Sequence, residues 1–248
     1  LKSAFDGRLS AYDPAVPEGT LARGHVMRGR SGGKTPKIDS KEREENIRES
    51  GRTWEDALRE ASSGMMSDPV LMSIAAGFDQ GYRNSCSAES ALADAKRIVD
   101  LSDDNAIEID FYRHAGHGEE TAGLKIYHYG APVALSRRVP LLENMGFRVI
   151  SERTFETPSR PADGKTTYIH DMELENSFAS PIDLSDNGAL LEDVFISIWS
   201  GLSDNDAYAA LVQTARLPAR SIGLLRAYGR YLQQAGIPQN QEFVASVL

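Results

Sequence analysis

The sequence has 248 residues with 27 basic and 36 acidic side chains, a net charge of −9, and 41% hydrophobic residues. The acidic balance argues against nucleic acid and anionic membrane partners, because both bind a basic face. No run approaches the roughly 18 apolar residues of a membrane span, and the first residues do not resemble a signal peptide. The single cysteine, Cys86, excludes an internal disulfide and a cysteine-based zinc site. We therefore expect an acidic, cytoplasmic protein.

Residues 1–63 are predicted to form part of an α/β unit. Branched apolar residues in 21–30 favour a short strand, and the proline-containing segment 11–20 before it is expected to be a loop or a hairpin connection. Asp39 is placed to begin a helix, with Glu42 at the capping-box position three residues later. One strand and one helix do not make a domain, so we expect the remaining half of a unit that begins outside this sequence.

Residues 64–102 are predicted to form a helical connection. A short helix is expected at 69–78, and a clearer amphipathic helix at 87–101 has alanine, leucine and isoleucine on one face. Ser87 is the expected N-cap of the second helix.

Residues 103–180 are predicted to form a module built on a β-sheet. Apolar and polar residues alternate in segments that favour strands, and the third of these changes phase near Ser151. The expected strands are 106–113, 124–130, 147–156 and 166–174. Between the second and third strands we expect a helix at 136–146. We expect Ser136 to cap it, Pro140 to lie in its first turn, and Gly146 to end it in a left-handed conformation.

The predicted order from residue 87 onward is helix, strand, strand, helix, strand, strand. This is the inventory of a ferredoxin-like antiparallel sheet with both helices on one face. This order is reached when the last helix–strand pair of the usual order, strand, helix, strand, strand, helix, strand, is moved to the front. We therefore expect a permuted module with 125–130 as its formal first strand. The fold class predicted is α+β, with the partial α/β unit before this module and an all-α tail after it.

Residues 181–248 form the predicted all-α tail. Apolar stripes indicate helices near 189–201, 204–215 and 218–236, and a last helix begins at Gln239. We expect that last helix to pack on residues that lie outside this sequence.

Several short motifs favour turns or solvated side chains over catalytic or metal sites. Residues 29–35, GRSGGKT, depart from the spacing of a phosphate-binding loop. His114 and His117 lie on an expected turn without a distant third metal ligand. His170 and Asp171 are adjacent on an expected strand, so their side chains should point to opposite faces.

The loop after the formal first strand is the ligand site we favour. It leads into a helix whose first turn offers backbone amides and arginines, which suit a carboxylate, and a glycine there allows close approach of a ligand. The candidate ligand-binding residues are Gly130, Ala131, Ser136, Arg137 and Arg138. A plain tight turn with surface arginines is the alternative. We predict no catalytic residue and no metal ligand.

The sequence resembles the large bacterial NAD-specific glutamate dehydrogenases. The resemblance rests on ordered runs that cover nearly the whole chain. They are LARGHVMRGRSGGKTPKID at 21–39 with RTWEDAL at 52–58, KIYHYGAPVALSRRVPLLENMGFRVISERTFE at 125–156, YIHDMELE at 168–175, and LLRAYGRYLQQAGIPQNQEFVASVL at 224–248.

This resemblance implies a region N-terminal to a catalytic domain. Residues 1–63 would be a partial ACT-like unit, 103–180 an ACT-like module, and 181–248 a helical segment leading to an absent catalytic domain. The intact protein would oxidatively deaminate L-glutamate to 2-oxoglutarate with NAD. The family's catalytic lysines and nucleotide-binding glycine loop have no counterpart here, so we expect no cofactor and no activity in this piece alone.

The expected role is therefore regulation or assembly. The resemblance implies contacts with the missing catalytic and N-terminal domains, a homo-oligomer when intact, and an amino-acid effector at the loop 130–132, where ACT modules often bind amino acids. An interaction scaffold without a ligand is one alternative. A stand-alone enzyme with an unrecognised site is another.

Overall fold

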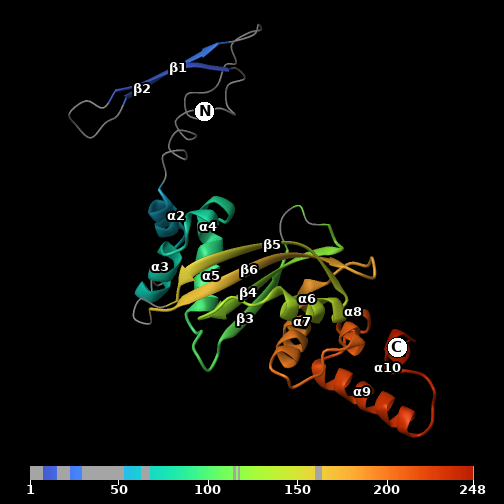
Figure 1. Cartoon of the computed structure of the whole chain (residues 1–248). Helices are drawn as coiled ribbons and strands as arrows, with labels where there is room; N and C mark the ends of the chain where they lie inside the picture. Colours follow the sequence, from blue (N-terminus) through green and yellow to red (C-terminus); the bar gives the residue numbers. More distant parts are fainter. Residues whose placement is uncertain are drawn as a thin grey trace. The chain divides into compact units, whose positions relative to one another are not determined.

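The computed structural model describes residues 8–15, 23–29, 53–62, 68–113, 116, 118–159 and 164–247 (Figure 1). The chain divides into two units, Leu1–Ala57 and Leu58–Leu248. The expectations for the glycine-rich motif after Gly29, for the helix start at Asp39, and for His114 and His117 lie outside the described residues.

The first unit contains an antiparallel pair of strands, β1 (Arg8–Ala15) and β2 (Arg23–Gly29), with a register shift between Leu9 and Ala11. The strand predicted at 21–30 is confirmed by β2. The loop or hairpin connection predicted for 11–20 is wrong as far as Ala15, because the residues up to there belong to β1 and pair with β2. Proline is tolerated in such a strand since a two-stranded ribbon leaves one edge of each strand unpaired.

Helix α2 (Trp54–Ala61) is the described end of the helix predicted from Asp39. Thr53 precedes its first turn, and the Thr53 hydroxyl donates to Asp56 Oδ2 at 2.7 Å. The amide of Asp56 donates back to Thr53 Oγ1 at 3.2 Å, which satisfies one of the free N–H groups at the helix start.

The second unit is built on a four-stranded antiparallel sheet with the order β3-β4-β6-β5. Its strands confirm the predicted ones and are β3 (Ile107–Tyr112), β4 (Thr121–Tyr129), β5 (Phe147–Pro158) and β6 (Thr166–Asn176). The hairpin of β5 and β6 lies back against β4, so β4 and β5 run parallel with β6 between them. Helix α6 (Leu135–Asn144) makes the crossover from β4 to β5.

The phase change predicted near Ser151 is a β-bulge. The pairing of β5 with β6 shifts between Val149 and Ser151. Phe147 is buried before the bulge and Phe155 after it, and the extra residue moves these two rings to opposite faces of the sheet.

One face of the sheet packs on α6 and α7 (Leu184–Trp199) (Figure 1). Alternate residues of the central strands point to this face, as the period of two requires. The core that they form with the two helices includes Ile109, Phe111, Leu124, Ile126, Leu141, Leu142, Phe147, Met172, Leu174, Leu191, Val194 and Phe195.

The other face of the sheet is covered by α3 (Pro69–Ala76), α4 (Gln80–Ser85) and α5 (Ala88–Ile98) (Figure 1). Helix α5 confirms the helix predicted at 87–101, with Ser87 as its N-cap, whereas α4 was not predicted. Asp94 of α5 is bound by Lys125 and Tyr127, which alternate with Leu124 and Ile126 on β4.

The expectation that α5 shares a face with α6 is therefore wrong. Helix α7 takes that place, because it follows β6 directly and packs on β3 and α6. Read from β4, the chain gives strand, helix, strand, strand, helix, and β3 supplies the last strand. The module is permuted by one strand rather than by a helix–strand pair.

The all-α tail is confirmed and consists, after α7, of η1 (Ala207–Ala210), α8 (Leu211–Thr214), α9 (Ala219–Gln234) and α10 (Gln241–Val247). Arg226 holds α9 in place, because its buried guanidinium donates to both Asp206 carboxylate oxygens at 2.7 and 2.9 Å. The Tyr208 hydroxyl donates to Gln241 Oε1 at 2.9 Å and ties η1 to α10. Within the described ranges, no helix is long and apolar enough to span a membrane.

Candidate functional site

The loop between β4 and α6 is open on its outer side. Gly130 has a φ of +82°, and its N–H donates to Thr166 O at 2.8 Å. A Cβ at Gly130 would meet no atom within 4 Å, so its backbone conformation alone requires glycine. Ala131 is exposed, and its carbonyl oxygen lies 2.8 Å from His128 Nδ1.

The N-cap of helix α6 lies two residues earlier than predicted. Ala134 is its N-cap and makes no side-chain bond, so the expectation that Ser136 caps the helix is wrong. Pro140 accordingly lies in the second turn rather than the first. The start is set by Val133, whose N–H donates to His170 Nε2 at 3.0 Å and fixes the chain just before the cap.

Arg138 is buried beneath this loop. Its guanidinium donates to Val133 O at 2.6 Å and to Glu152 Oε1. Glu152 Oε1 also lies 3.1 Å from His170 Nδ1 and accepts a bond from the Thr154 hydroxyl at 3.0 Å. Arg138 therefore holds the loop to β5 and β6 instead of facing solvent.

The same network determines the charge of His170. Burial of the ring lowers the pKa of His170 below its ordinary value, and the nearby Arg138 charge, the next largest cause, lowers it further. Since Nε2 accepts the Val133 N–H, the ring proton belongs on Nδ1, where it faces Glu152. His170 is a neutral structural residue in this arrangement.

Arg137 connects α6 to the end of α7. Its guanidinium stacks on the Trp199 ring at 3.5 Å and donates to Trp199 O at 3.1 Å. The His128 ring lies edge-on to the same indole at 5.9 Å.

The structure thus places all the predicted site residues close together, but the side chains of Arg137 and Arg138 are bonded to other parts of the protein. Gly130, Ala131, Ser136, Arg137 and Arg138 surround one loop, and both guanidiniums are engaged by the protein. The first turn of an α-helix leaves backbone N–H groups without intrahelical acceptors. Those amides and the exposed Ser136 hydroxyl are what the loop offers to an anion.

A buried polar cluster on the other face of the sheet was missed by the sequence analysis. Asp94 accepts two bonds from Lys125 Nζ at 2.6 and 2.9 Å, one from Tyr82 at 2.5 Å and one from Tyr127 at 2.9 Å. Burial first, and then the Asp94 charge, raises the pKa of both tyrosines. The sequence signal for this cluster was the presence of Lys125 and Tyr127 in a strand whose other residues are mostly apolar.

A neighbouring group confirms the expectation for His170 and Asp171. Asp171 lies on the opposite face from His170 and accepts bonds from Tyr112 and from Arg153, the latter at 3.1 Å. Gly123 makes room for this arrangement, because a Cβ there would lie 2.2 Å from the Tyr112 ring.

The side chains of these two groups bond to one another and hold the strands and helices together. Cys86 ends α4 half-buried, and burial raises the pKa of its thiol, which disfavours the reactive thiolate. Among the described residues, no three His, Cys, Asp or Glu side chains are grouped so as to hold a metal ion.

Comparison with protein families identifies the sheet and the tail. Residues 106–187 match the family model described as glutamate dehydrogenase, ACT3 domain. Residues 203–248 match the model described as glutamate dehydrogenase, helical motif 3. Over these residues the chain is similar to two regions of glutamate dehydrogenases, their ACT3 domain and their helical motif 3.

The curated relatives that the chain resembles are NAD-specific glutamate dehydrogenases. The protein from Halomonas elongata is 33% identical over 248 residues, 98% of this chain and 15% of the relative. That from Pseudomonas aeruginosa is 34% identical, covering 85% of this chain and 13% of the relative. That from Mycobacterium tuberculosis is 31% identical, covering 82% and 13%. The chain therefore spans only about 15% of the length of the relatives it matches.

Proposed function

We propose that this chain is a non-catalytic regulatory and assembly region of an NAD-dependent glutamate dehydrogenase. The intact protein would oxidatively deaminate L-glutamate to 2-oxoglutarate and use NAD as cofactor, while this region would bind no cofactor. The proposal draws support from the two family matches and from the similarity to NAD-specific enzymes over most of the chain.

The observation that carries the assembly role is a second apolar face on α9. The helix packs on its own chain through Ile222 and Gly229, which are buried. On the opposite side, Leu224, Tyr228 and Tyr231 follow one another at helical spacing and are 57%, 65% and 64% exposed. We call these three residues the outer stripe of α9.

Such a surface favours contact with another protein segment. Contiguous exposed apolar patches in soluble proteins mark interaction sites more often than isolated apolar residues do. Aromatic residues, tyrosine among them, are enriched in protein interfaces. The outer stripe therefore supports docking against another domain of the same longer chain or against a second subunit.

The test places charges on the outer stripe in the longer protein. Tyr228→Glu combined with Tyr231→Glu should weaken assembly, measured by light scattering after gel filtration, and lower dehydrogenase activity. The 248-residue chain alone should lose no more than about 0.5 kcal/mol per substitution, because both side chains are largely exposed. Leu202→Glu is the control, since Leu202 is 84% exposed and lies outside the stripe. Assembly and activity equal to those of the control would contradict the proposal.

The finer assignments belong to the same proposal. Residues 1–63 would form a partial ACT-like unit, 64–102 a helical connection, 103–180 the ACT-like module, and 181–248 the segment leading to the catalytic domain. The intact protein would be a cytoplasmic homo-oligomer in which this region contacts the other domains of its own chain.

An amino-acid effector at the β4–α6 loop is the regulatory part of the proposal. Its carboxylate would meet the first-turn amides of α6 beside Gly130, Ala131 and Ser136, while Arg137 and Arg138 hold the walls. Thermal melting with each amino acid, citrate and NAD tests this, because a specific ligand raises the midpoint by mass action. Ser136→Asp should abolish the rise by repelling the carboxylate, and Ser136→Asn, its neutral match, should not.

A ligand-free scaffold is the second candidate. The internal engagement of Arg137 and Arg138 favours it, because neither guanidinium, among the described residues of the loop, is then free to bind a carboxylate. No rise in the midpoint with any compound would support the scaffold, and a rise lost in Ser136→Asp would support the sensor.

A further inference from the structure

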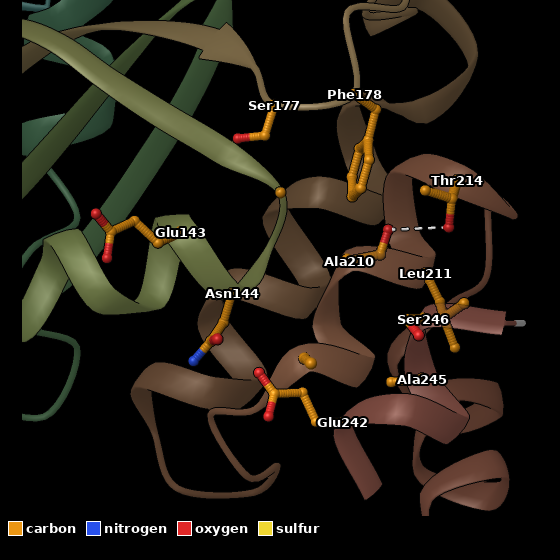
Figure 2. A pocket seen from close by; sticks show the side chains of 12 residues that line it. Glu143, Asn144, Ser177, Phe178, Ala210, Leu211, Thr214, Glu242, Ala245 and Ser246 are labelled. Atoms are coloured by element: carbon orange, nitrogen blue, oxygen red, sulfur yellow. Dashed lines mark hydrogen bonds between the residues drawn. The ribbon is translucent and has the colours of Figure 1, made fainter.

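A pocket of about 480 Å³ lies where the ACT3 domain meets helical motif 3 (Figure 2). Ligand sites occur preferentially at such junctions, and this volume falls in the usual range for small molecules. The ACT3 side is the end of α6 and the turn after β6, and the other side is η1, α8 and α10. Asn144, Gly146 and Phe178 line the pocket on the first side, and Leu211, Glu242 and Ala245 are among the residues that line it on the other.

The pocket walls are held by bonds that cross the junction. Gln213 Nε2 donates to Met145 O at 2.6 Å, and Asn144 Nδ2 donates to Asn205 Oδ1 at 3.0 Å. The Phe178 N–H donates to Asn176 Oδ1 at 2.9 Å and orients the turn. The space is therefore shaped by folded elements on both sides.

Phe178 forms the upper wall of the pocket in Figure 2, with its ring turned inward from the turn after β6. Gly146 has a φ of +86°, and a Cβ there would lie 2.5 Å from the Phe178 ring. Glycine at this helix end thus allows the ring to lie where it does. Leu211 and Ala245 supply apolar surface on the helical side.

The polar groups of the pocket are suited to a donor-bearing cation. The Glu242 carboxylate turns toward Asn144 in Figure 2, and Glu143 adds a second negative charge at the margin. The amide nitrogen of Asn144 is used by Asn205, so its carbonyl oxygen is the group available to a ligand. None of the described lining residues is a lysine or arginine. The Phe178 ring adds a face that attracts cations.

We propose that this pocket binds a small primary amine with an apolar body. The ammonium group would pair with Glu242 and the Asn144 carbonyl oxygen, and the apolar body would lie between Phe178 and Leu211. A bound amine would touch both domains and so favour their present arrangement. The site shares no residue with the β4–α6 loop, and its test needs neither dehydrogenase activity nor an amino-acid effector.

The test uses the 248-residue chain and three probes that differ in charge. These are 2-phenylethylamine, the neutral 2-phenylethanol and the anionic 3-phenylpropionate, each titrated while amide NMR signals and the thermal midpoint are recorded. We expect 2-phenylethylamine to bind most tightly and to move the signals of Phe178, Leu211 and Ala245. We expect 3-phenylpropionate to bind at least about fivefold more weakly, which corresponds to about 1 kcal/mol.

Variants assign the binding to the pocket. Glu242→Gln should weaken 2-phenylethylamine about two- to fivefold, the range for a solvent-accessible ion pair. Glu156→Gln, an equal change of charge on an exposed residue outside the pocket, should leave it unchanged. Ala210→Phe places a ring among the lining residues and should abolish binding. Equal affinity for amine and carboxylate, an unaltered affinity in Glu242→Gln, or no binding of any probe would each overturn the proposal.

Discussion

Replacing Lys125 with methionine tests the claim that a buried ion pair holds α5 to the sheet. The Lys125 and Asp94 side chains are only 9% and 3% exposed, and Nζ lies 2.6 Å from Asp94 Oδ2. Methionine retains most of the apolar stem and removes the charge. Asp94 would keep its bonds from Tyr82 and Tyr127 but would lose its counter-ion.

The expected loss is about 3 to 5 kcal/mol, the range for breaking a buried pair by removing one partner. The retained tyrosine bonds place Lys125→Met near the lower end of this range. Lys165→Met is the matched control, because Lys165 pairs with Asp103 at the surface and exposed pairs contribute about 0 to 1 kcal/mol. Adding Asp94→Asn to Lys125→Met should cost less than it does in the native chain, since the carboxylate is then already unpaired.

Urea unfolding of the 248-residue chain at about pH 7, followed by circular dichroism, gives these free energies by linear extrapolation. A loss in Lys125→Met no larger than that in Lys165→Met would refute the reasoning. It would mean that Asp94 is stabilised by its tyrosine bonds and by water, and that the lysine charge contributes little.

Two further predictions concern the ends of α6. His170 is neutral in the fold, so stability present above about pH 6.5, the ordinary pKa of histidine, should fall as the pH drops from there toward the lowered pKa of the folded state. His170→Gln keeps an acceptor for the Val133 N–H and should remove that part of the pH dependence in urea titrations. Gly130→Ala should cost about 1 kcal/mol from its positive φ alone. Gly146→Ala should cost at least about 1 kcal/mol more, because the Phe178 ring must also move, and equal melting temperatures would contradict this.

The β-strands of this protein were predictable because a strand is encoded by a period of two within a short window. The phase change near Ser151 gave the bulge in β5 from the same signal. Gly146 was assigned its left-handed conformation from its place after an amphipathic helix, and its φ of +86° confirms that. The cap of α6 was wrongly predicted at Ser136, because a bond from Val133 to His170, distant in sequence, determines where the helix starts.

The contents of the candidate site depended on the tertiary structure. The sequence gathered Gly130, Ala131, Ser136, Arg137 and Arg138 at one loop, because they are near neighbours in the chain. The sequence could not show that Arg138 forms an ion pair with Glu152, or that Arg137 stacks on Trp199, 62 residues away. An arginine at a helix start has the same local pattern whether it faces solvent or is buried.

The side of the sheet on which α5 packs is the clearest such case. Its amphipathic pattern specified a helix with one apolar face, and that pattern is the same against either face of a sheet. The decision rests on Asp94 meeting Lys125, 31 residues along the chain, and on α7 occupying the face beside α6. Periodicity within a segment therefore determined the elements of this protein. Contacts between distant segments, which no local pattern encodes, decided which faces meet and which charges are buried.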